Sequence, residues 1–319
     1  MAKEKEILDD IEQLFSFPGN RDLLLGPGDD CAILAPMRGR LVITTDEQVE
    51  GTHFLPGSAP EDIACRLMRS NISDLAGMGY VRPVSCVAGA GLAPDLPPDF
   101  ARRFISGLKS EAEHFGITVA GGNLAGAREN HFYLTVWGEA MAEPVLRDTA
   151  KSGDIIATIG PMGEAKAALE ILMRNDGNEM REYAPMVENF WRPVPQLAAG
   201  RILAENAIVS AMLDNSDGLY TSAAIIAERS SLRAVIDAEK VRPSAILSKW
   251  CGENGKNAVA YAIDGGEDYG LVFAVPPEKL PLLRELLPNS QEIGHFEQGN
   301  GIILTNFNGK IDGFEHFSN

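Results

Sequence analysis

Apolar and polar residues alternate along the chain with two different periods, which predicts a mixed α/β fold. Apolar residues at helical spacing predict helices over residues 3–16, 60–79, 98–115, 163–174 and 219–229. Short apolar or β-branched runs predict strands over residues 31–34, 41–46, 84–90, 117–120, 132–138, 155–159, 208–213, 258–263 and 271–275. The chain beyond residue 275 is expected to hold another helix, short strands and a turn at Asn308-Gly309.

A polar segment separates two stretches of this α/β pattern. Residues 141–152 hold Pro144 among polar residues, which is typical of a linker. The length of 319 residues with 45% hydrophobic content suits two ordinary domains. We therefore expect mixed α/β domains over residues 1–140 and residues 141–319.

Carboxylates gather at the ends of the predicted elements. Asp29 and Asp30 follow a Gly-Pro-Gly turn, and Asp46 ends a β-branched run, so each is expected where a strand meets a loop. A lone Gly-Asp-Asp is most often a solvated turn. Similar acidic positions recur downstream, which favours a site; they are Asp74, Asp214, Asp217, Glu267 and Asp268.

The predicted helix over residues 60–79 carries one of these carboxylates at an unusual place. On a helical wheel Asp74 falls inside the apolar arc, between Ile63 and Leu67, opposite a polar arc with Arg66 and Ser70. A buried carboxylate without a partner is costly, so we expect a cation beside Asp74. The alternatives are a helix cap or an arginine pair.

Two glycine-rich or polar junctions could approach a ligand. The strand over residues 117–120 is expected to end at Gly121-Gly122, which would let the backbone come close to a ligand or form an ordinary turn. Ser216 and Asp217 precede a helix and could serve only as its cap. A helix N-terminus also attracts phosphate, and aspartates there favour a metal bridge.

Composition excludes several classes of partner. The formal net charge of −17 and a pI near 4.7 exclude an electrostatic site for nucleic acid or an anionic membrane. No apolar run approaches the roughly 18 residues of a membrane span, and the N-terminus lacks a signal-peptide pattern. Four cysteines without zinc spacing favour free thiols. We expect a cytoplasmic protein.

The carboxylates limit the classes of reaction that the site could catalyse. Hard oxygen ligands suit Mg²⁺ or Mn²⁺, whereas a glycosidase would need only two carboxylates. The sequence has no His-x-x-x-His spacing, no Gly-x-Ser-x-Gly elbow, no P-loop and no protein-kinase signature. These features favour metal-dependent phosphate chemistry on a scaffold without a P-loop.

Seven motifs in order along the chain resemble those of the thiamine-monophosphate kinase family, in the superfamily of aminoimidazole ribonucleotide synthetase. They are Gly28-Asp-Asp30, Thr44-Thr-Asp46 with Glu50-Gly-Thr-His53-Phe, Asn71-Ile-Ser-Asp74, Arg147 with Lys151-Ser-Gly-Asp154, Asp214-Asn-Ser-Asp217-Gly, Gly265-Gly-Glu267-Asp-Tyr and Gly313-Phe-Glu-His-Phe. The resemblance implies an N-terminal ATP- and metal-binding domain whose strands form a barrel at a homodimer interface. It also implies a C-terminal α/β sandwich that completes the active site.

The resemblance implies transfer of the γ-phosphoryl group of ATP to thiamine monophosphate, giving thiamine diphosphate, with several Mg²⁺ ions and no dedicated catalytic base. By motif position the metal ligands would be Asp30, Thr44, Thr45, Asp46, Asp74, Asn123, Asp214 and Asp217. ATP would contact Gly122, Asn123, Arg147 and Ser216, and the substrate would contact His53, Glu267 and Phe314.

Three positions depart from the family pattern. The family usually has Asp at Asn123, often Trp at Phe314, and an acidic residue at Gly270. Asn123 matters most, because it would be a metal ligand. Two alternatives stay open: another ATP-dependent enzyme of the superfamily, and a non-catalytic nucleotide-binding relative.

Overall fold

The computed structural model describes residues 4–15, 21–27, 31–309 and 311. The chain divides into two compact units. The first unit comprises residues 1–75 and 81–141, and the second comprises residues 76–80 and 142–319. Both contain helices and strands, which confirms the predicted mixed α/β class.

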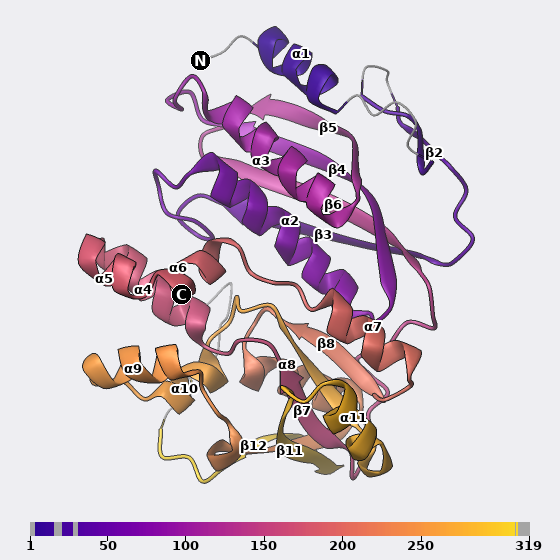
Figure 1. Ribbon diagram of the computed structural model, residues 1–319, viewed down its shortest axis with the longest axis vertical. Helices are drawn as coiled ribbons and strands as arrows, with labels where there is room; N and C mark the ends of the chain where they lie inside the picture. Colours follow the sequence, from indigo (N-terminus) through magenta and orange to yellow (C-terminus); the bar gives the residue numbers. More distant parts are fainter. Residues whose placement is uncertain (1–3, 16–20, 28–30, 310, 312–319) are drawn as a thin grey trace. The chain divides into compact units, whose positions relative to one another are not determined.

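The first unit places helices on one face of a sheet (Figure 1). Its helices are α1 (Glu4–Leu14), α2 (Pro60–Gly77, whose last residues belong to the second unit) and α3 (Phe100–Phe115). Its strands are β1 (Leu23–Leu25), β2 (Ile33–Leu34), β3 (Leu41–Val49), β4 (Val81–Leu92), β5 (Thr118–Gly126) and β6 (His131–Ala140). Within the described residues β3-β6-β4-β5 form a four-stranded sheet in which β4 and β5 run parallel. Phe132 anchors the core against Phe104, with ring centroids 4.2 Å apart.

Strand β3 shows the period-2 alternation of a sheet with one covered face. Its even-numbered residues are buried or half-buried, and its odd-numbered residues up to Glu47 are exposed. The strand continues to Val49, so Asp46 lies inside β3 and the prediction that it ends a strand is wrong. The nine-residue pairing with β6 extends β3 past the β-branched run.

The uncovered face of this sheet carries large apolar side chains. Leu41 and Ile43 on β3 are 58% and 61% exposed, and Tyr133 on β6 is 38% exposed. The Tyr133 ring lies directly against Gly89 of β4, where a Cβ atom would come within 1.9 Å of the ring. We call the residues Leu41, Ile43, Gly89 and Tyr133 the open face.

The glycine pair lies within a strand and not in a turn. Gly121, Gly122 and Asn123 pair with Val87, Ala88 and Gly89 of β4, and β5 continues to Gly126. The prediction that the strand ends at these glycines is therefore wrong. Pairing with β4 satisfies the backbone there, and Gly122 leaves room for the Ala88 carbonyl, which a Cβ atom would approach within 2.0 Å.

Helix α2 is buried on nearly all sides. Arg66 and Ser70, which belong to the predicted polar arc, are each 1% exposed. Helix α3 packs closely here, because a Cβ atom at Gly107 would lie 2.9 Å from the Glu61 Cα atom. The amphipathic pattern therefore identified the helix but not the extent of its burial.

Glu139 on β6 joins three parts of the first unit. One carboxylate oxygen accepts hydrogen bonds from the backbone N–H groups of Arg38 and Gly39, at 2.8 and 2.7 Å. The other accepts from Arg82 at 2.9 Å, and Arg82 also bonds Asp22 at 2.9 Å. The Arg82 hydrogen bond is the largest cause that lowers the pKa of the Glu139 carboxyl to about 2.

Glu139→Gln is expected to lower the free energy of unfolding by about 2 kcal/mol near neutral pH, because glutamine loses the charge that these donors bond. The folded-state pKa lies below the ordinary value of 4.5. The stabilisation is thus fully present above that value and is lost as pH falls towards about 2. Urea unfolding across this range measures it, with Glu182→Gln at an exposed Lys249 pair as the control. A gap that stays constant down to the folded-state pKa would contradict this account.

The second unit is a sheet covered by helices on both faces. Its strands are β7 (Ile155–Ile159), β8 (Ala211–Asn215), β9 (Leu232–Asp237), β10 (Gly270–Val275), β11 (Gln291–Gln298) and β12 (Gly301–Thr305). Its helices are α4 (Glu164–Arg174), α5 (Gly177–Glu182), α6 (Ala184–Trp191), α7 (Leu197–Glu205), α8 (Leu219–Arg229), α9 (Ala245–Glu253), α10 (Ala258–Asp264) and α11 (Leu280–Leu286), with the short 3₁₀ turns η1 (Ala238–Lys240) and η2 (Pro277–Lys279). In the described part of the chain the strand order is β12-β9-β11-β7-β10-β8.

Strand β10 explains why both faces of this sheet need helices. All six of its residues are buried. Val272 and Ala274 pack in a core with Leu219 of α8, whereas Phe273 packs in the opposite core with Leu203 of α7. A strand buried on both faces reads as a continuous apolar run.

Residues 258–264 form helix α10 and not the predicted strand. The Asn257 side chain accepts hydrogen bonds from the backbone N–H groups of Val259 and Ala260, which caps the helix. Short apolar runs do not distinguish a buried helix from a strand by periodicity alone. Strand β9 and helix α9 were not predicted either.

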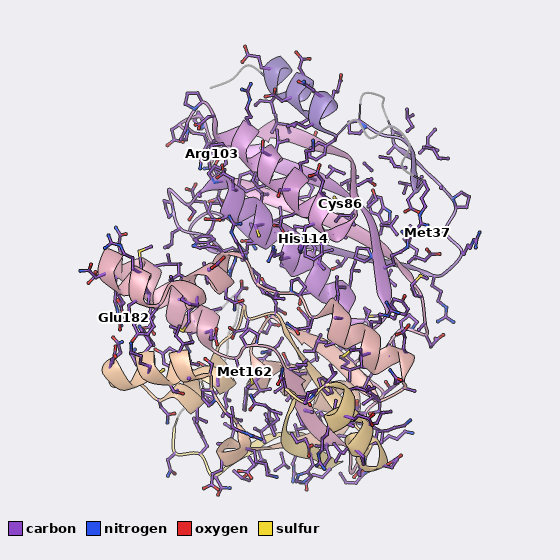
Figure 2. The ribbon with its side chains drawn as sticks, in the orientation of Figure 1. Met37, Cys86, Arg103, His114, Met162 and Glu182 are labelled. Atoms are coloured by element: carbon purple, nitrogen blue, oxygen red, sulfur yellow. The ribbon has the colours of Figure 1, made fainter. Side chains whose placement is uncertain are left out.

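The four cysteines differ in accessibility, and all of them are free and described. Cys86 lies on β4 within the first unit and is fully buried (Figure 2). Burial raises the pKa of the Cys86 thiol to about 12 and is the main cause that raises the pKa of Cys251 to about 11. Cys65 is also buried, whereas Cys31 is exposed.

None of the helices in the described ranges combines the length and the apolar character that a membrane crossing demands.

Candidate functional site

The first unit brings three predicted metal ligands to one side of its sheet. Thr44 donates a hydrogen bond from its hydroxyl to the Asp74 carboxylate on α2. Asp46 follows Thr44 by two positions on β3, so both side chains belong to the half-buried face of the strand. The apolar arc that holds Asp74 packs α2 onto this face, as its position on the wheel indicated.

Thr45 points to the other face of β3. Its residue is exposed, and its hydroxyl bonds the Leu134 carbonyl and the Thr135 hydroxyl, each at 3.1 Å. Consecutive residues of a strand alternate between faces. The structure therefore separates the side chain of Thr45 from those of Thr44 and Asp46, although the motif places all three together.

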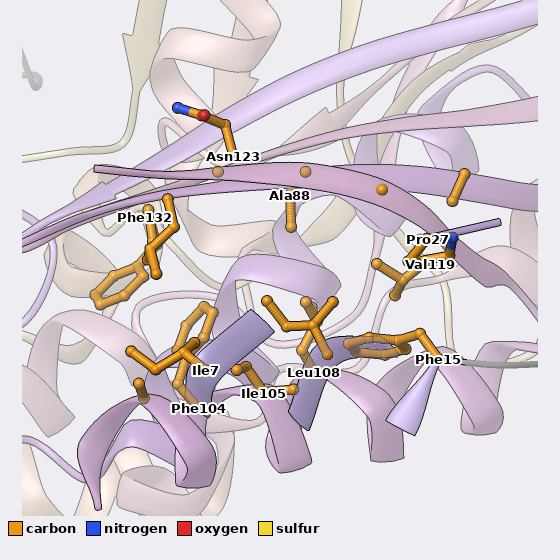
Figure 3. Close-up of a pocket in the computed structure, with 18 of the residues that line it drawn as sticks. Ile7, Phe15, Pro27, Ala88, Phe104, Ile105, Leu108, Val119, Asn123 and Phe132 are labelled. Carbon is orange, nitrogen blue, oxygen red and sulfur yellow. The ribbon is translucent and has the colours of Figure 1, made fainter. Parts of the chain in front are cut away.

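Asn123 is also exposed and lies on the face of β5 opposite the buried apolar side chains (Figure 3). It pairs with Gly89 across the sheet, beside the open face. Gly122 precedes it and lines a cavity. Two of the four predicted ATP contacts therefore lie next to each other on β5: Gly122 lines the cavity, and the Asn123 side chain extends from the other face of the sheet.

The cavity adjoining Gly122 has a volume of about 540 Å³. It lies between α1, α3 and the strands β4 and β5, and Figure 3 shows Phe104, Leu108, Val119 and Phe132 beneath the sheet. Its walls are predominantly apolar. The sequence patterns did not predict it, although the helical spacing of three apolar residues carried a signal; they are Ile7, Ile11 and Phe15, which line it from the α1 side.

His53 sits in the turn that follows β3. The backbone N–H of Val49 donates a hydrogen bond to His53 Nδ1 at 3.0 Å. The neutral ring therefore carries its proton on Nε2, because Nδ1 acts as an acceptor. This hydrogen bond lies within the local turn.

The second unit brings two loops together that are some fifty positions apart. Strand β8 ends at Asn215, and the Ser216 hydroxyl lies 3.5 Å from an Asp214 carboxylate oxygen. The backbone N–H of Glu267 donates to the Ser216 carbonyl at 2.6 Å. Asp217 is half-buried in the first of these loops. Of the predicted residues, Asp214 lies near the end of β8, and Ser216, Asp217 and Glu267 lie in the two loops.

Glycine permits the first of these loops to enter its helix. Gly218 has φ of 95° and precedes α8, and a Cβ atom there would lie 3.0 Å from the Asp264 carbonyl. Any other residue would be strained in that conformation and crowded by the neighbouring loop. Gly218 therefore sets the direction in which the chain passes from the carboxylates after β8 into α8.

The place of Asp268 among the acidic candidates had suggested a metal site. The structure instead places Asp268 in the core. It is fully buried, and its carboxylate accepts hydrogen bonds from the backbone N–H groups of Gly163 and Ala165 at the start of α4. Burial is the main cause that raises the pKa of Asp268 to about 7.

Arg147 is exposed in the segment that joins β6 to β7. The carbonyl of its neighbour Leu146 accepts a hydrogen bond from the backbone N–H of Met212 on β8 at 3.1 Å, which places this segment beside the strand that carries Asp214. Asp30 and Phe314 lie outside the described residues. Within the described residues, no group of three or more His, Cys, Asp or Glu side chains has the geometry of a metal site. The Thr44 hydroxyl and the Asp74 carboxylate, which are hydrogen-bonded to each other, are oxygen donors of the kind that Mg²⁺ prefers.

Comparison with known proteins identifies similar chains. Residues 28–140 match the family model of the AIR synthase related protein, N-terminal domain. The chain is 32% identical to the thiamine-monophosphate kinase of Aquifex aeolicus over 295 residues, which cover 91% of this chain and 92% of that protein. It is also 32% identical to the thiamine-monophosphate kinase of Haemophilus influenzae, over 80% of this chain and 76% of that protein.

Solved structures show the same similarity in three dimensions. The structure of AaThiL complexed with AMPPCP and TMP has a TM-score of 0.80 and 28% identity, and the match covers 98% of this chain and 97% of that chain. The thiamine-monophosphate kinase of Stenotrophomonas maltophilia has a TM-score of 0.81 and 29% identity, with 95% and 96% covered. Hydrogenase maturation protein HypE in complex with ATP, 19% identical with a TM-score of 0.72, shares the fold.

Proposed function

The chain belongs to the thiamine-monophosphate kinase family, and from that premise we propose that it transfers the γ-phosphoryl group of ATP to the phosphate of thiamine monophosphate. The products are thiamine diphosphate and ADP. The observation that carries this proposal is 32% identity to a thiamine-monophosphate kinase over 91% of the chain.

By motif position the proposed metal ligands are Asp30, Thr44, Thr45, Asp46, Asp74, Asn123, Asp214 and Asp217. The Thr44 hydrogen bond to Asp74 brings two of them together, whereas Thr45 and Asn123 lie on the open-face side of the sheet. The burial of Asp214, which is 8% exposed, supports its place in this set. Several bound Mg²⁺ ions would neutralise phosphate charge as the two polyanions approach in line.

We assign the cavity beside Gly122 to the base of ATP. A flat aromatic base suits apolar walls that include Phe104 and Leu108. Gly122 lies in the wall of this cavity, where its backbone would meet the nucleotide. Arg147 and Ser216 are the further ATP contacts that the motifs suggest, and His53, Glu267 and Phe314 are the proposed substrate contacts.

The chain need not supply a strong general base. The second pKa of a phosphate monoester is about 6, so the acceptor oxygen is already largely ionised near neutral pH. The task of the side chains is to orient two phosphates and to exclude water. A carboxylate such as Glu267 would in addition attract the cationic thiazolium ring.

Asn123→Asp is expected to shift the Mg²⁺ activation curve to about tenfold lower concentration, because a carboxylate adds a charge worth roughly 1.4 kcal/mol at a partly solvated site. The amide oxygen of wild-type Asn123 can still coordinate the ion, so the wild type should be active. Initial rates over a Mg²⁺ titration measure the shift, and Asn289→Asp, at an exposed asparagine of the second unit, is a control. An unchanged curve would mean that residue 123 does not contact the metal.

We propose a homodimer in which the open face meets its copy and the paired sheets form a barrel. Large apolar side chains exposed on an uncovered sheet are typical of a protein interface. The apolar area comes from Leu41, Ile43 and Tyr133. Gly89 has no side chain, which leaves room for the Tyr133 ring to lie against the sheet.

Ile43→Asp is expected to convert the dimer to a monomer, because it places a charge in the proposed apolar interface. Sedimentation equilibrium measures the mass, and circular dichroism checks the fold. Ile303→Asp is the matched control, because Ile303 is 42% exposed on β12 of the other sheet. A dimer that persists in Ile43→Asp at the same dissociation constant would refute this interface.

The reaction is tested by incubating the protein with Mg-ATP and thiamine monophosphate and identifying the products by mass. Thiamine diphosphate and ADP in equal amounts are expected. ADP formed only with another small phosphorylated or carboxylated substrate would indicate a different enzyme of the superfamily. Nucleotide binding without turnover would indicate a non-catalytic relative. The use of ATP and the free cysteines support a cytoplasmic location.

A further inference from the structure

The backbone of the loop Gly265–Tyr269 in the second unit is hydrogen-bonded to the end of β8 and the residue after it at two positions. The backbone N–H of Glu267 donates to the Ser216 carbonyl at 2.6 Å, and that of Tyr269 donates to the Asn215 carbonyl at 3.3 Å. These bonds attach the loop to the end of β8. The position of Glu267 is therefore set by the same strand that carries Asp214.

The backbone of this loop is strained at two side-chain-bearing residues. Glu267 has φ of 67° and Tyr269 has φ of 54°, both in the left-handed region that glycine normally occupies. Such conformations persist only where the surroundings hold them, and they cluster at functional sites. The residue between them, Asp268, supplies the anchor.

Asp268 fastens the middle of the loop to the core. Its carboxylate accepts from Ala165 N–H at 2.9 Å and also from Gly163 N–H, and its side chain is inaccessible to solvent. The loop cannot rotate about its axis without breaking these bonds. Glu267 and Tyr269 are consequently held in a fixed relation to each other.

The fixed positions of the two residues bring the Tyr269 hydroxyl to the Glu267 carboxylate. It donates a hydrogen bond to Glu267 Oε2 at 3.0 Å, while the tyrosine itself is only 4% exposed. Glu267 is half-buried, so its carboxylate stands at the border between the tyrosine and solvent. A buried hydroxyl of fixed position restricts the rotamers that the bonded carboxylate can adopt.

We propose that Tyr269 is a positioning residue that aims the Glu267 carboxylate at the cationic part of the thiamine phosphate substrate. This inference rests on the proposed function and adds a residue to it. Tyr269 acts through Glu267 and does not itself touch the substrate. Its effect should therefore appear in substrate affinity and not in the phosphoryl-transfer step.

Tyr269→Phe tests the proposal because it removes the hydroxyl and keeps the ring. We expect the KM for thiamine monophosphate to rise about tenfold, as a hydrogen bond to a charged group allows, with kcat and the KM for ATP unchanged within about twofold. The control is Tyr183→Phe, which removes a hydroxyl bonded to Glu253 from another buried tyrosine of the same unit. That variant should leave both KM values unchanged.

A double-mutant cycle tests whether Tyr269 acts through Glu267. In a Glu267→Gln background, Tyr269→Phe should add no further increase in the KM for thiamine monophosphate, because the bonded carboxylate is already gone. Glu267→Asp, which withdraws the carboxylate from an intact tyrosine, should raise the same KM if Tyr269→Phe does not fold.

The outcomes separate this inference from the function on which it rests. An active wild type with an unchanged KM in Tyr269→Phe would overturn the positioning role and leave the function standing. Equal increases in the KM of both substrates, with a lower melting temperature, would show a structural role and overturn it too. A wild type that forms no ADP with thiamine monophosphate would overturn the proposed function itself.

Discussion

Asp74→Asn is expected to lower kcat/KM by about 10³-fold or more, because loss of a metal-binding carboxylate removes several kcal/mol of transition-state charge stabilisation. The fold should persist. Asparagine keeps an oxygen that can accept the Thr44 hydrogen bond, and removing one charge relieves repulsion from Asp46 in the metal-free protein. The melting temperature in metal-free buffer should therefore stay constant or rise.

Steady-state kinetics and a thermal melt on the same samples check both parts of this prediction. Asp95→Asn, in an exposed turn of the first unit, provides the control and should be as active as the wild type. A large fall in melting temperature without metal would instead assign Asp74 to the stability of α2. Asp46→Asn should behave as Asp74→Asn does, since both are proposed ligands.

Free thiamine is expected to be phosphorylated at least about 10³-fold more slowly than thiamine monophosphate. The monophosphate brings an oxygen that is already ionised and able to bridge to metal, whereas an alcohol must lose a proton during the reaction. His53 is the histidine of the proposed site, and its Nδ1 is already engaged with the Val49 N–H. The chain is not expected to provide a base in its place.

Initial rates of ADP formation at equal concentrations of the two acceptors measure this discrimination, with product masses to identify the phosphorylated species. ADP formation without acceptor sets the background. Comparable rates for the two acceptors would mean that a side chain removes the alcohol proton, and the proposed mechanism would be wrong.

Apolar spacing predicted an element correctly where the pattern fits only one type of secondary structure. Residues 219–229 were predicted and observed as α8, which begins directly after Gly218. Residues 258–264 failed this test, because their helix depends on the Asn257 cap and on the neighbours that bury it. The mixed α/β class follows from the pattern, whereas the order of the strands depends on contacts between distant segments.

The candidate site, too, was predicted only in part from the sequence. The helical wheel placed Asp74 on the buried arc, and the structure adds its partner Thr44, which is thirty positions away. Motif reasoning grouped Thr45 with Thr44, although strand alternation turns their side chains to opposite faces. Asp268 resembled a ligand in sequence, and only its contacts with the start of α4 identify it as an anchor.

The cysteines give the protein a natural position for a chemical label. A thiol reacts as its thiolate and only where a reagent can reach it. Cys65, Cys86 and Cys251 are buried, whereas Cys31 is exposed and lines the cavity beneath β4 and β5. A maleimide dye added to the native protein should therefore attach at Cys31, and its emission would follow whatever enters that cavity, without any engineered cysteine.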